Sequence, residues 1–141
     1  MDRTDLFKEN ISVVIPTFNR INSLKRALLS VYNQTLEPNE IIVVDNDSAD
    51  GTVEKLKLEF PEIRLLIEKT RGVSAARNAG IRAAKSKWVA FLDSDDEWLP
   101  KKLEQQCLAL SLDSEGVRLI HTDEIWIRNG KFLNQKKKHK K

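Results

Sequence analysis

The sequence has one cysteine, no long apolar run and no large excess of one charge outside its last residues. Because Cys107 is alone, an intrachain disulfide is excluded, and no second cysteine is present to build a zinc cluster with His121 or His139. A reducing, cytoplasmic setting is therefore expected. The longest apolar runs, WVAFL and IIVV, are far shorter than the roughly 18 residues that suggest a membrane span. The polar start, MDRTDLFKEN, does not fit a signal peptide.

The charge is unevenly placed along the chain. The formal net charge is +3, but five lysines lie in the last six residues, KKKHKK, so the rest of the chain is mildly acidic at −2. This argues against a nucleic-acid surface spread over the fold. A terminal run of lysines is more often a solvated tail or a contact with anionic membrane lipid. At 40% hydrophobic and 32% charged residues, the 141-residue chain is expected to be one soluble globular domain.

The spacing of apolar residues predicts strands that alternate with helices. Asn22 is predicted to cap the first helix, and the Asn129–Gly130 pair predicts a hairpin near the end. This series implies an α/β fold, a mostly parallel sheet with helices on both faces. We expect an extension at 1–10, one domain at 11–135 and a basic tail at 136–141. The predicted strands are 11–16, 40–45, 63–68 and 87–93, and the later predicted helices are 53–60, 73–85 and 101–112.

The polar residues that follow the strands are the candidates for a site, because ligands bind outside the carboxyl ends of the strands in such sheets. Thr17 and Asn19 follow the first strand, residues 45–47 end the second, and residues 93–96 end the fourth. Polar clusters at three strand ends predict one site at this edge of the sheet.

The segment DSDD fits a metal site, because magnesium and manganese are usually shared between one or two carboxylates and substrate phosphates. Asp93 and Asp95 are two residues apart, so they point the same way in an extended chain. Asp93 begins at the edge of the core and needs a partner, which is either a cation or Arg77. The alternative is an acidic turn that caps the next helix with Asp96 and Glu97.

Asp45 follows four apolar residues and is suited to accept hydrogen bonds from a base or a ribose. As a site carboxylate it is expected to contribute little to packing, and a turn or helix-capping aspartate is the alternative. Arg71 and Arg77 suit phosphate recognition, with surface charge on a helix as their alternative. His121 lies in an alternating segment and is interpreted as a packed or half-exposed histidine.

Four motifs together resemble a known family. The stretch from Ile11 to Gln106 contains, in order, ISVVIPTFNR, EIIVVDNDSADGT, RGVSAARNAGI and WVAFLDSDDEWLPKKLEQQ, which are similar to the motifs of the family 2 glycosyltransferases, inverting enzymes with the GT-A fold. The resemblance implies transfer of a sugar from a nucleotide-diphosphate sugar, a UDP-sugar above all, to a saccharide or lipid-linked acceptor. It also implies a part in cell envelope polysaccharide biosynthesis, in the cytoplasm or at the inner face of the membrane.

The resemblance implies roles for single residues. Thr17 and Asp45 would contact the nucleobase, and Arg77 would contact the nucleotide. Asp93 would lie on the ribose side, beside Asp95, which would bind the divalent cation, Mg²⁺ or Mn²⁺, of the family's DxD motif. The other residues that the resemblance places in substrate binding are Pro16, Asn19, Asn46 and Ser94.

The chain departs from the family pattern in three ways. The usual DDGS is here DNDS, so Asn46 and Asp47 replace an aspartate and a glycine, and Arg71 stands where the family has asparagine. Family members carry an acceptor-binding half after the DxD region, and that half supplies the general base. Both are therefore expected beyond Lys141, and this chain resembles the nucleotide-sugar-binding part.

Other functions fit the pattern less well. A cation-dependent nucleotidyltransferase also uses strand-end carboxylates, but it would show a glycine-rich, lysine-bearing loop where this chain has PTFNRINS. A receiver domain would have an acidic pair after the first strand, where Thr17 and Asn19 stand. A nucleic-acid-binding module that uses the tail, and a non-catalytic nucleotide-binding fragment, are the remaining alternatives.

Overall fold

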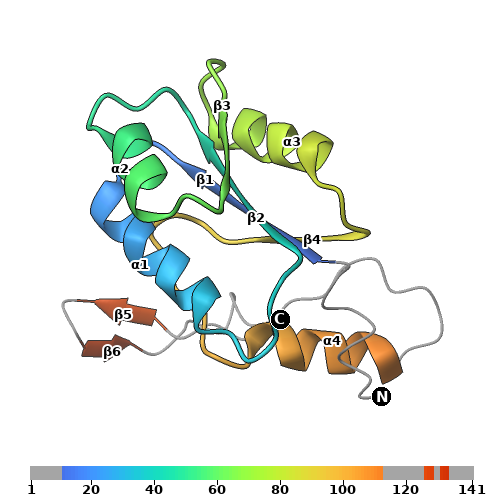
Figure 1. Cartoon of the computed structure of the whole chain (residues 1–141). Coiled ribbons are helices and arrows are strands. Elements are labelled where there is room, and N and C mark those ends of the chain that lie inside the picture. The colour runs from blue at the N-terminus through green and yellow to red at the C-terminus, as the bar shows by residue number, and fades with distance from the viewer. Residues whose placement is uncertain (1–10, 113–125, 129–130, 134–141) are drawn as a thin grey trace.

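The computed structural model describes residues 11–112, 126–128 and 131–133. These residues form an α/β fold around a sheet of four parallel strands in the order β3-β2-β1-β4 (Figure 1), which confirms the predicted fold class. The strands are β1 (Ile11–Thr17), β2 (Glu40–Asp45), β3 (Arg64–Ile67), β4 (Trp88–Phe91), β5 (Trp126–Arg128) and β6 (Lys131–Leu133). The helices are α1 (Ile21–Tyr32), α2 (Thr52–Glu59), α3 (Val73–Ala83) and α4 (Lys102–Leu112).

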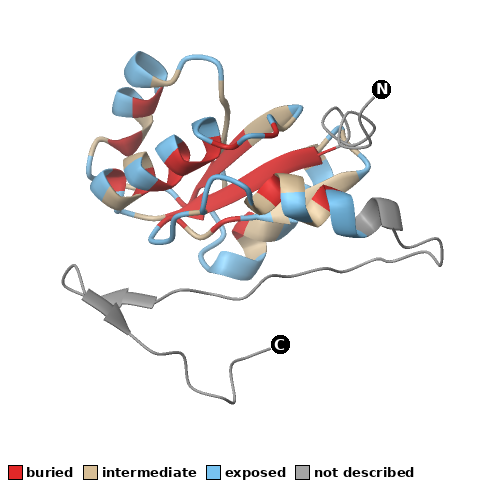
Figure 2. Ribbon diagram, turned by 90° about the horizontal axis from the view of Figure 1, so that it is seen from below, coloured by how far each residue is buried: buried red, intermediate tan, exposed pale blue. Residues whose placement is uncertain are grey.

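The two central strands, β1 and β2, are buried on both faces of the sheet (Figure 2). Along β1, Val13 and Ile15 pack into one apolar cluster, while Val14 between them packs into a second cluster. Successive side chains of a strand point to opposite faces, so a continuous apolar run is what a strand covered on both sides requires. The run ISVVI thus explains why this segment forms the middle of the sheet.

Helices cover both faces of the sheet, as predicted. Leu28 of α1, Leu56 of α2 and Leu103 of α4 belong to the larger cluster, and Ala76 of α3 belongs to the smaller one. Figure 1 shows α3 on one side of the sheet and α1 and α2 on the other. Each fully buried leucine contributes on the order of 2 kcal/mol through the apolar surface it removes from water.

Asn22 does not cap α1, so this prediction is wrong. The N-cap residue is Arg20, whose side chain makes no capping hydrogen bond, and Asn22 is exposed within the helix. The N–H of Ile21 instead donates to the carboxylate of Asp50, at 3.3 Å. A negative charge at this place is also favoured by the helix dipole. The acceptor for the start of α1 therefore comes from the loop after β2.

The predicted hairpin is confirmed by its strands. β5 and β6 pair antiparallel, with Trp126 opposite Leu133 and Arg128 opposite Lys131.

Among the helices of the described residues, none is both long and apolar enough to cross a membrane. The predicted features that lie outside the described residues are the extension 1–10, the turn 129–130, the tail 136–141 and His121.

Gly80 lies where α3 comes closest to the sheet. A Cβ added to Gly80 would lie 2.3 Å from Cγ1 and 3.0 Å from Cγ2 of Val14. Replacing glycine with alanine in a helix normally stabilises it by about 1 kcal/mol. Here Val14 is fully buried on the central strand, and a close-packed interior resists its displacement.

We therefore expect Gly80→Ala to lower the free energy of unfolding by about 1–3 kcal/mol, measured by urea denaturation. Asn78→Ala is the matched control, because Asn78 is an exposed residue of the same helix, and it should change stability by no more than about 0.5 kcal/mol. A stability gain from Gly80→Ala would contradict the close contact between α3 and β1.

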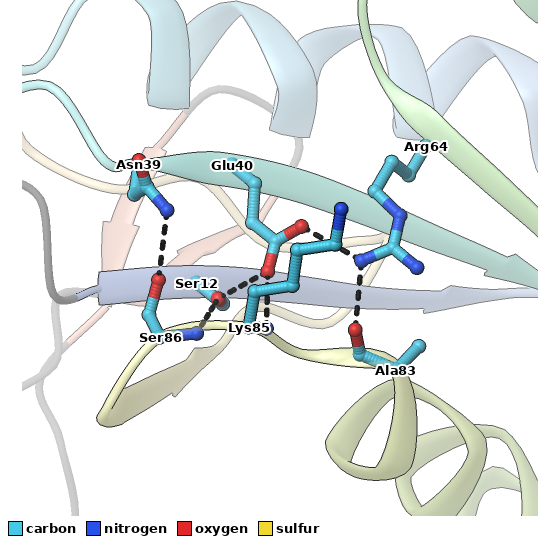
Figure 3. Close-up of polar contacts among 7 residues, drawn as sticks. All are labelled: Ser12, Asn39, Glu40, Arg64, Ala83, Lys85 and Ser86. Carbon is cyan, nitrogen blue, oxygen red and sulfur yellow. Dashed lines mark hydrogen bonds and ion pairs between the residues drawn. The ribbon is translucent and has the colours of Figure 1, made fainter.

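A polar network joins the amino ends of the strands, at the edge of the sheet opposite the candidate site (Figure 3). The Glu40 carboxylate, which starts β2, accepts hydrogen bonds from the Ser12 hydroxyl at 2.6 Å and the Lys85 N–H at 2.7 Å. It also pairs with the Arg64 guanidinium at 2.8 Å, and Arg64 donates to the Ala83 carbonyl at 2.7 Å. The network thus ties the start of three strands to the end of α3.

Candidate functional site

The candidate site lies where β1, β2 and β4 end. Thr17 is opposite Asp45 in the register of β1 and β2, and the Asn46 N–H donates to the Thr17 carbonyl at 2.9 Å. On the other side of β1, the Leu92 N–H donates to the Val14 carbonyl at 3.1 Å, one residue before the DSDD segment. The sheet therefore brings the loops after these three strands to one edge.

Asp45 is fully buried and holds the loop that follows β2. One carboxylate oxygen accepts from the Ser48 N–H at 2.8 Å, and the other accepts from the Ser48 hydroxyl at 2.6 Å. The Ser48 oxygen in turn accepts from the Asn19 N–H at 2.8 Å. Asp45 therefore has the turn role that the sequence left open, and the expectation that it contributes little to packing is wrong.

The same contacts connect the loops after β1 and β2. Asn19 accepts from the Ala49 N–H at 2.8 Å through its side-chain oxygen. Asn19 and Asp47 both have positive φ values, 50° and 65°, and asparagine and aspartate tolerate this region better than most residues. The loops are thus fixed to each other by reciprocal hydrogen bonds.

Asn46 secures a third loop, the one between β3 and α3. Its side-chain amide donates to the carbonyls of Glu68 and Thr70, at 2.7 and 2.8 Å. Its side-chain oxygen accepts from the Gly72 N–H at 3.0 Å. An ionised aspartate has no donor for the two carbonyls, so the departure from the family pattern at this position has a structural explanation. A contact of Asn46 with substrate stays a prediction.

The DSDD segment forms a turn rather than an extended chain. The Asp96 N–H donates to the Asp93 carbonyl at 3.0 Å, and carboxylate oxygens of Asp93, Asp95 and Asp96 lie within 4.8 Å of one another. α4 begins only at Lys102, so Asp96 and Glu97 do not lie in its first turn, and the helix-capping alternative is wrong. We call residues 93–96 the acidic turn.

Two arginines from different elements pair with the acidic turn. Arg77 of α3 lies 2.9 Å from Asp93, as the sequence allowed, and Arg20 from the loop after β1 lies 2.9 Å from Asp95. Like charges held this close raise each other's energy, and the guanidinium groups offset part of that repulsion. The turn therefore combines carboxylates that suit a cation with arginines that suit a phosphate.

Thr17 is buried at the end of β1, with 4% of its surface exposed. Within the described part of the chain its hydroxyl has no hydrogen-bond partner, and neither does Nε of Arg77. Burying such a group without a partner costs about 1–3 kcal/mol, so each of these two atoms calls for a specific explanation, and a bound ligand or water would supply the missing partner. Pro16 and Ser94, two further predicted residues, are also buried.

Phe18 and Arg20 were missed by the sequence analysis. The Arg71 guanidinium lies over the Phe18 ring, 4.2 Å from its centroid, so Arg71 is held beside the end of β1 by a cation–π contact. Phe18 and Arg20 lie in PTFNR, next to Thr17 and Asn19. Their position directly after a central strand was the signal in the sequence that could have identified them.

A comparison with protein families shows which family the chain belongs to. The model of "Glycosyl transferase family 2" matches residues 12–130. The chain belongs to this family. Family membership excludes the receiver and nucleotidyltransferase alternatives and confirms the resemblance seen in the motifs. The acidic turn lies within the residues that the family model matches.

Individual relatives agree with this family assignment. The chain is 37% identical over 99 residues to UDP-Glc:alpha-D-GlcNAc-diphosphoundecaprenol beta-1,3-glucosyltransferase WfgD of Escherichia coli, covering 68% of this chain and 39% of WfgD. It is 36% identical over 129 residues to the uncharacterized glycosyltransferase alr2836 of a Nostoc species, covering 89% of this chain and 40% of that protein. The chain thus spans less than half the length of these family 2 relatives.

Solved structures match the fold. TarS 1–349 of S. aureus in complex with UDP-GlcNAc aligns with a TM-score of 0.63 at 23% identity, over 82% of this chain and 39% of that TarS fragment. The mannosyltransferase PcManGT of Pyrobaculum calidifontis, in complex with GDP-Man and Mn²⁺, aligns with a TM-score of 0.58 at 27% identity, over 72% of this chain and 31% of PcManGT. The strand and helix arrangement is therefore that of family 2 glycosyltransferases with the GT-A fold.

The acidic turn fits a divalent cation on its own chemistry. Its three aspartate side chains each offer a carboxylate oxygen, and these oxygens are close enough to share one ion. Oxygen ligands of this kind are what Mg²⁺ and Mn²⁺ prefer. Asp93 and Asp95, the two predicted metal ligands, both belong to the turn.

Proposed function

We propose that this chain is the donor domain of an inverting glycosyltransferase. It binds a nucleotide-diphosphate sugar together with Mg²⁺ or Mn²⁺, and the proposed donor is a UDP-sugar. The observation that carries the proposal is the convergence of three strand ends on an acidic turn paired with two arginines, in a chain of family 2. The relative WfgD supports the donor, because its name states UDP-glucose. The Mn²⁺ complex of PcManGT supports the cation.

The residues are assigned roles by their place in the site. Thr17, with its unpartnered buried hydroxyl, and Asp45 would contact the nucleobase. Arg77 would contact the nucleotide from α3. Asp95 would hold the cation with Asp93, and the cation would supply positive charge to stabilise the leaving diphosphate.

The proposed reaction is a single displacement at the anomeric carbon. An acceptor hydroxyl forms the new glycosidic bond as the bond to the diphosphate oxygen breaks, and the hydroxyl proton passes to a general base. We place that base and the acceptor-binding part beyond Lys141, on the resemblance to longer family members. A saccharide or lipid-linked acceptor is proposed, and the diphosphoundecaprenol acceptor in the name of WfgD supports the lipid-linked class.

The proposed setting is cell envelope polysaccharide biosynthesis, in the cytoplasm or at the inner face of the membrane. A lipid-linked acceptor would require contact with the membrane surface. The lysine run at 136–141 would attract anionic lipid. Nucleic acid is not proposed as a partner, because the rest of the chain is mildly acidic.

Calorimetric titration with UDP, GDP and TDP tests the donor site. With excess Mn²⁺ we expect UDP to bind most tightly, and replacing Mn²⁺ by a chelator should weaken UDP binding by about ten-fold, because the cation is proposed to join carboxylate and phosphate oxygens. Asp95→Asn should lose most of this Mn²⁺ dependence. Glu97→Gln is the matched control, since Glu97 is exposed just after the acidic turn, and it should keep the dependence.

If UDP binds equally well with and without chelator in the unaltered chain, the metal role of Asp95 is wrong. If none of the three nucleotides binds in the presence of Mn²⁺, the donor-domain proposal itself fails.

A further inference from the structure

Arg20 joins two loops that are far apart in the sequence. Its guanidinium lies 2.9 Å from the Asp95 carboxylate across a separation of 75 residues. Both side chains are 54% exposed, so the ion pair lies at the surface. Pairs of this kind are worth only about 0–1 kcal/mol and are readily exchanged for other partners.

The backbone of Arg20 is held at the start of α1, whereas its side chain extends to Asp95 at the surface. Arg20 is the N-cap residue of α1, and its carbonyl accepts from the Leu24 N–H at 2.8 Å. The side chain makes no capping bond. The guanidinium therefore stays within reach of the acidic turn even when it releases Asp95.

Arg77 differs from Arg20 in this respect. It belongs to α3, which packs closely on the sheet through Gly80 and Val14, and its Nε atom is buried. The side chains of Arg77 and Asp93 are 39% and 44% exposed, compared with 54% for both Arg20 and Asp95. Of the two ion pairs, the one formed by Arg20 is therefore the more exposed and the less costly to exchange.

We propose that Arg20 is a tethered counter-ion of the metal site: it neutralises Asp95 when the site is empty, yields Asp95 to the divalent cation, and then pairs with the diphosphate of the donor. This inference rests on the proposed function, because it uses the same cation and diphosphate. A guanidinium and a divalent cation are both attracted to the same carboxylate charge and repel each other, so binding of one weakens binding of the other. Arginine suits the second partner because its planar group matches phosphate oxygens.

The proposal predicts opposite effects of one substitution. Arg20→Gln should bind Mn²⁺ alone about two- to five-fold more tightly than the unaltered chain, because the competing charge is gone. The same variant should bind UDP at saturating Mn²⁺ about three- to ten-fold more weakly, because a phosphate partner is lost. If Arg20 merely tied the two loops together, replacing it with glutamine would not strengthen Mn²⁺ binding.

The experiment measures free Mn²⁺ by electron paramagnetic resonance and UDP affinity by calorimetry, on the 141-residue chain. Arg20→Lys, which keeps the charge, should stay within about two-fold of the unaltered chain for Mn²⁺. Arg26→Gln is the matched control, because Arg26 is an exposed residue of α1 that forms no ion pair with the described residues. It should leave both affinities unchanged. Urea denaturation of each variant establishes that it is folded.

The proposal is overturned if Arg20→Gln and Arg26→Gln bind Mn²⁺ equally, if neither the unaltered chain nor Arg20→Gln binds Mn²⁺, or if Arg20→Gln leaves UDP affinity unchanged. In these cases UDP binding by the unaltered chain still decides the proposed function separately. If the unaltered chain binds no UDP at all, both the proposed function and this inference are wrong.

Discussion

Replacing Asp45 with alanine is expected to lower the free energy of unfolding by about 2–3 kcal/mol and to weaken UDP binding by at least about ten-fold. The stability effect follows from burial, because Asp45 is 0% exposed and accepts from both the N–H and the hydroxyl of Ser48. Removing the carboxylate leaves those donors without their acceptor. It also loosens the link from Ser48 to Asn19, and with it the loop after β1.

The binding effect follows from the position of Asp45 beside Thr17 at the ends of β2 and β1. Urea denaturation measures the first effect, and calorimetry at saturating Mn²⁺ measures the second. Asp47→Asn is the matched control: it removes one negative charge from the same loop, at an exposed residue, and it should change stability by less than about 0.5 kcal/mol. Stability loss with unaltered UDP affinity would show that Asp45 is a turn residue alone.

Glu40→Ala is expected to lower the free energy of unfolding by about 2–4 kcal/mol. The Glu40 side chain is only 11% exposed, and it is the common acceptor of Ser12, Lys85 and Arg64. Ser12 is fully buried, so its hydroxyl cannot turn to water when the carboxylate is removed. Glu37→Ala, at an exposed position before β2, is the control and should have little effect. A loss below about 0.5 kcal/mol from Glu40→Ala would contradict the structural role of the network.

The same carboxylate predicts a dependence of stability on pH. Burial alone would raise the pKa of Glu40, but hydrogen bonds from the Lys85 N–H, the Ser12 hydroxyl and Arg64 outweigh it and lower the pKa below the ordinary 4.5. The unfolded chain therefore binds this proton more tightly than the folded protein. The contribution of Glu40 is complete above the unfolded pKa and is lost as the pH falls through the lower folded value.

Urea denaturation from about pH 7 down to about pH 3 measures this dependence. We expect the stability difference between the unaltered chain and Glu40→Gln to be largest at neutral pH and to shrink in acid, where Glu40 itself becomes protonated. A difference that stays constant over the whole range would mean that ionisation of Glu40 contributes nothing.

Local patterns in the sequence determined the secondary structure and the places where the site residues stand. The runs in β1 and β2 are continuous and β-branched, and such runs fill strands that are covered on both faces. Each strand is joined to the next by a helix, so the strands run parallel and their carboxyl ends meet at one edge. Thr17, Asp45 and Asp93 could therefore be chosen from the sequence, because their distance from the strand ends is a local property.

The tertiary structure alone decided the partners of these side chains. Asp95 pairs with Arg20 across 75 residues, and the start of α1 takes its acceptor from Asp50 rather than from Asn22. Sequence periodicity cannot specify such pairs, because they depend on which loops the packed helices bring together. The acidic turn is the clearest case. Spacing predicts alternation along an extended chain, whereas the folded chain closes a turn from Asp93 to Asp96, and that turn is what gathers the carboxylates within 4.8 Å.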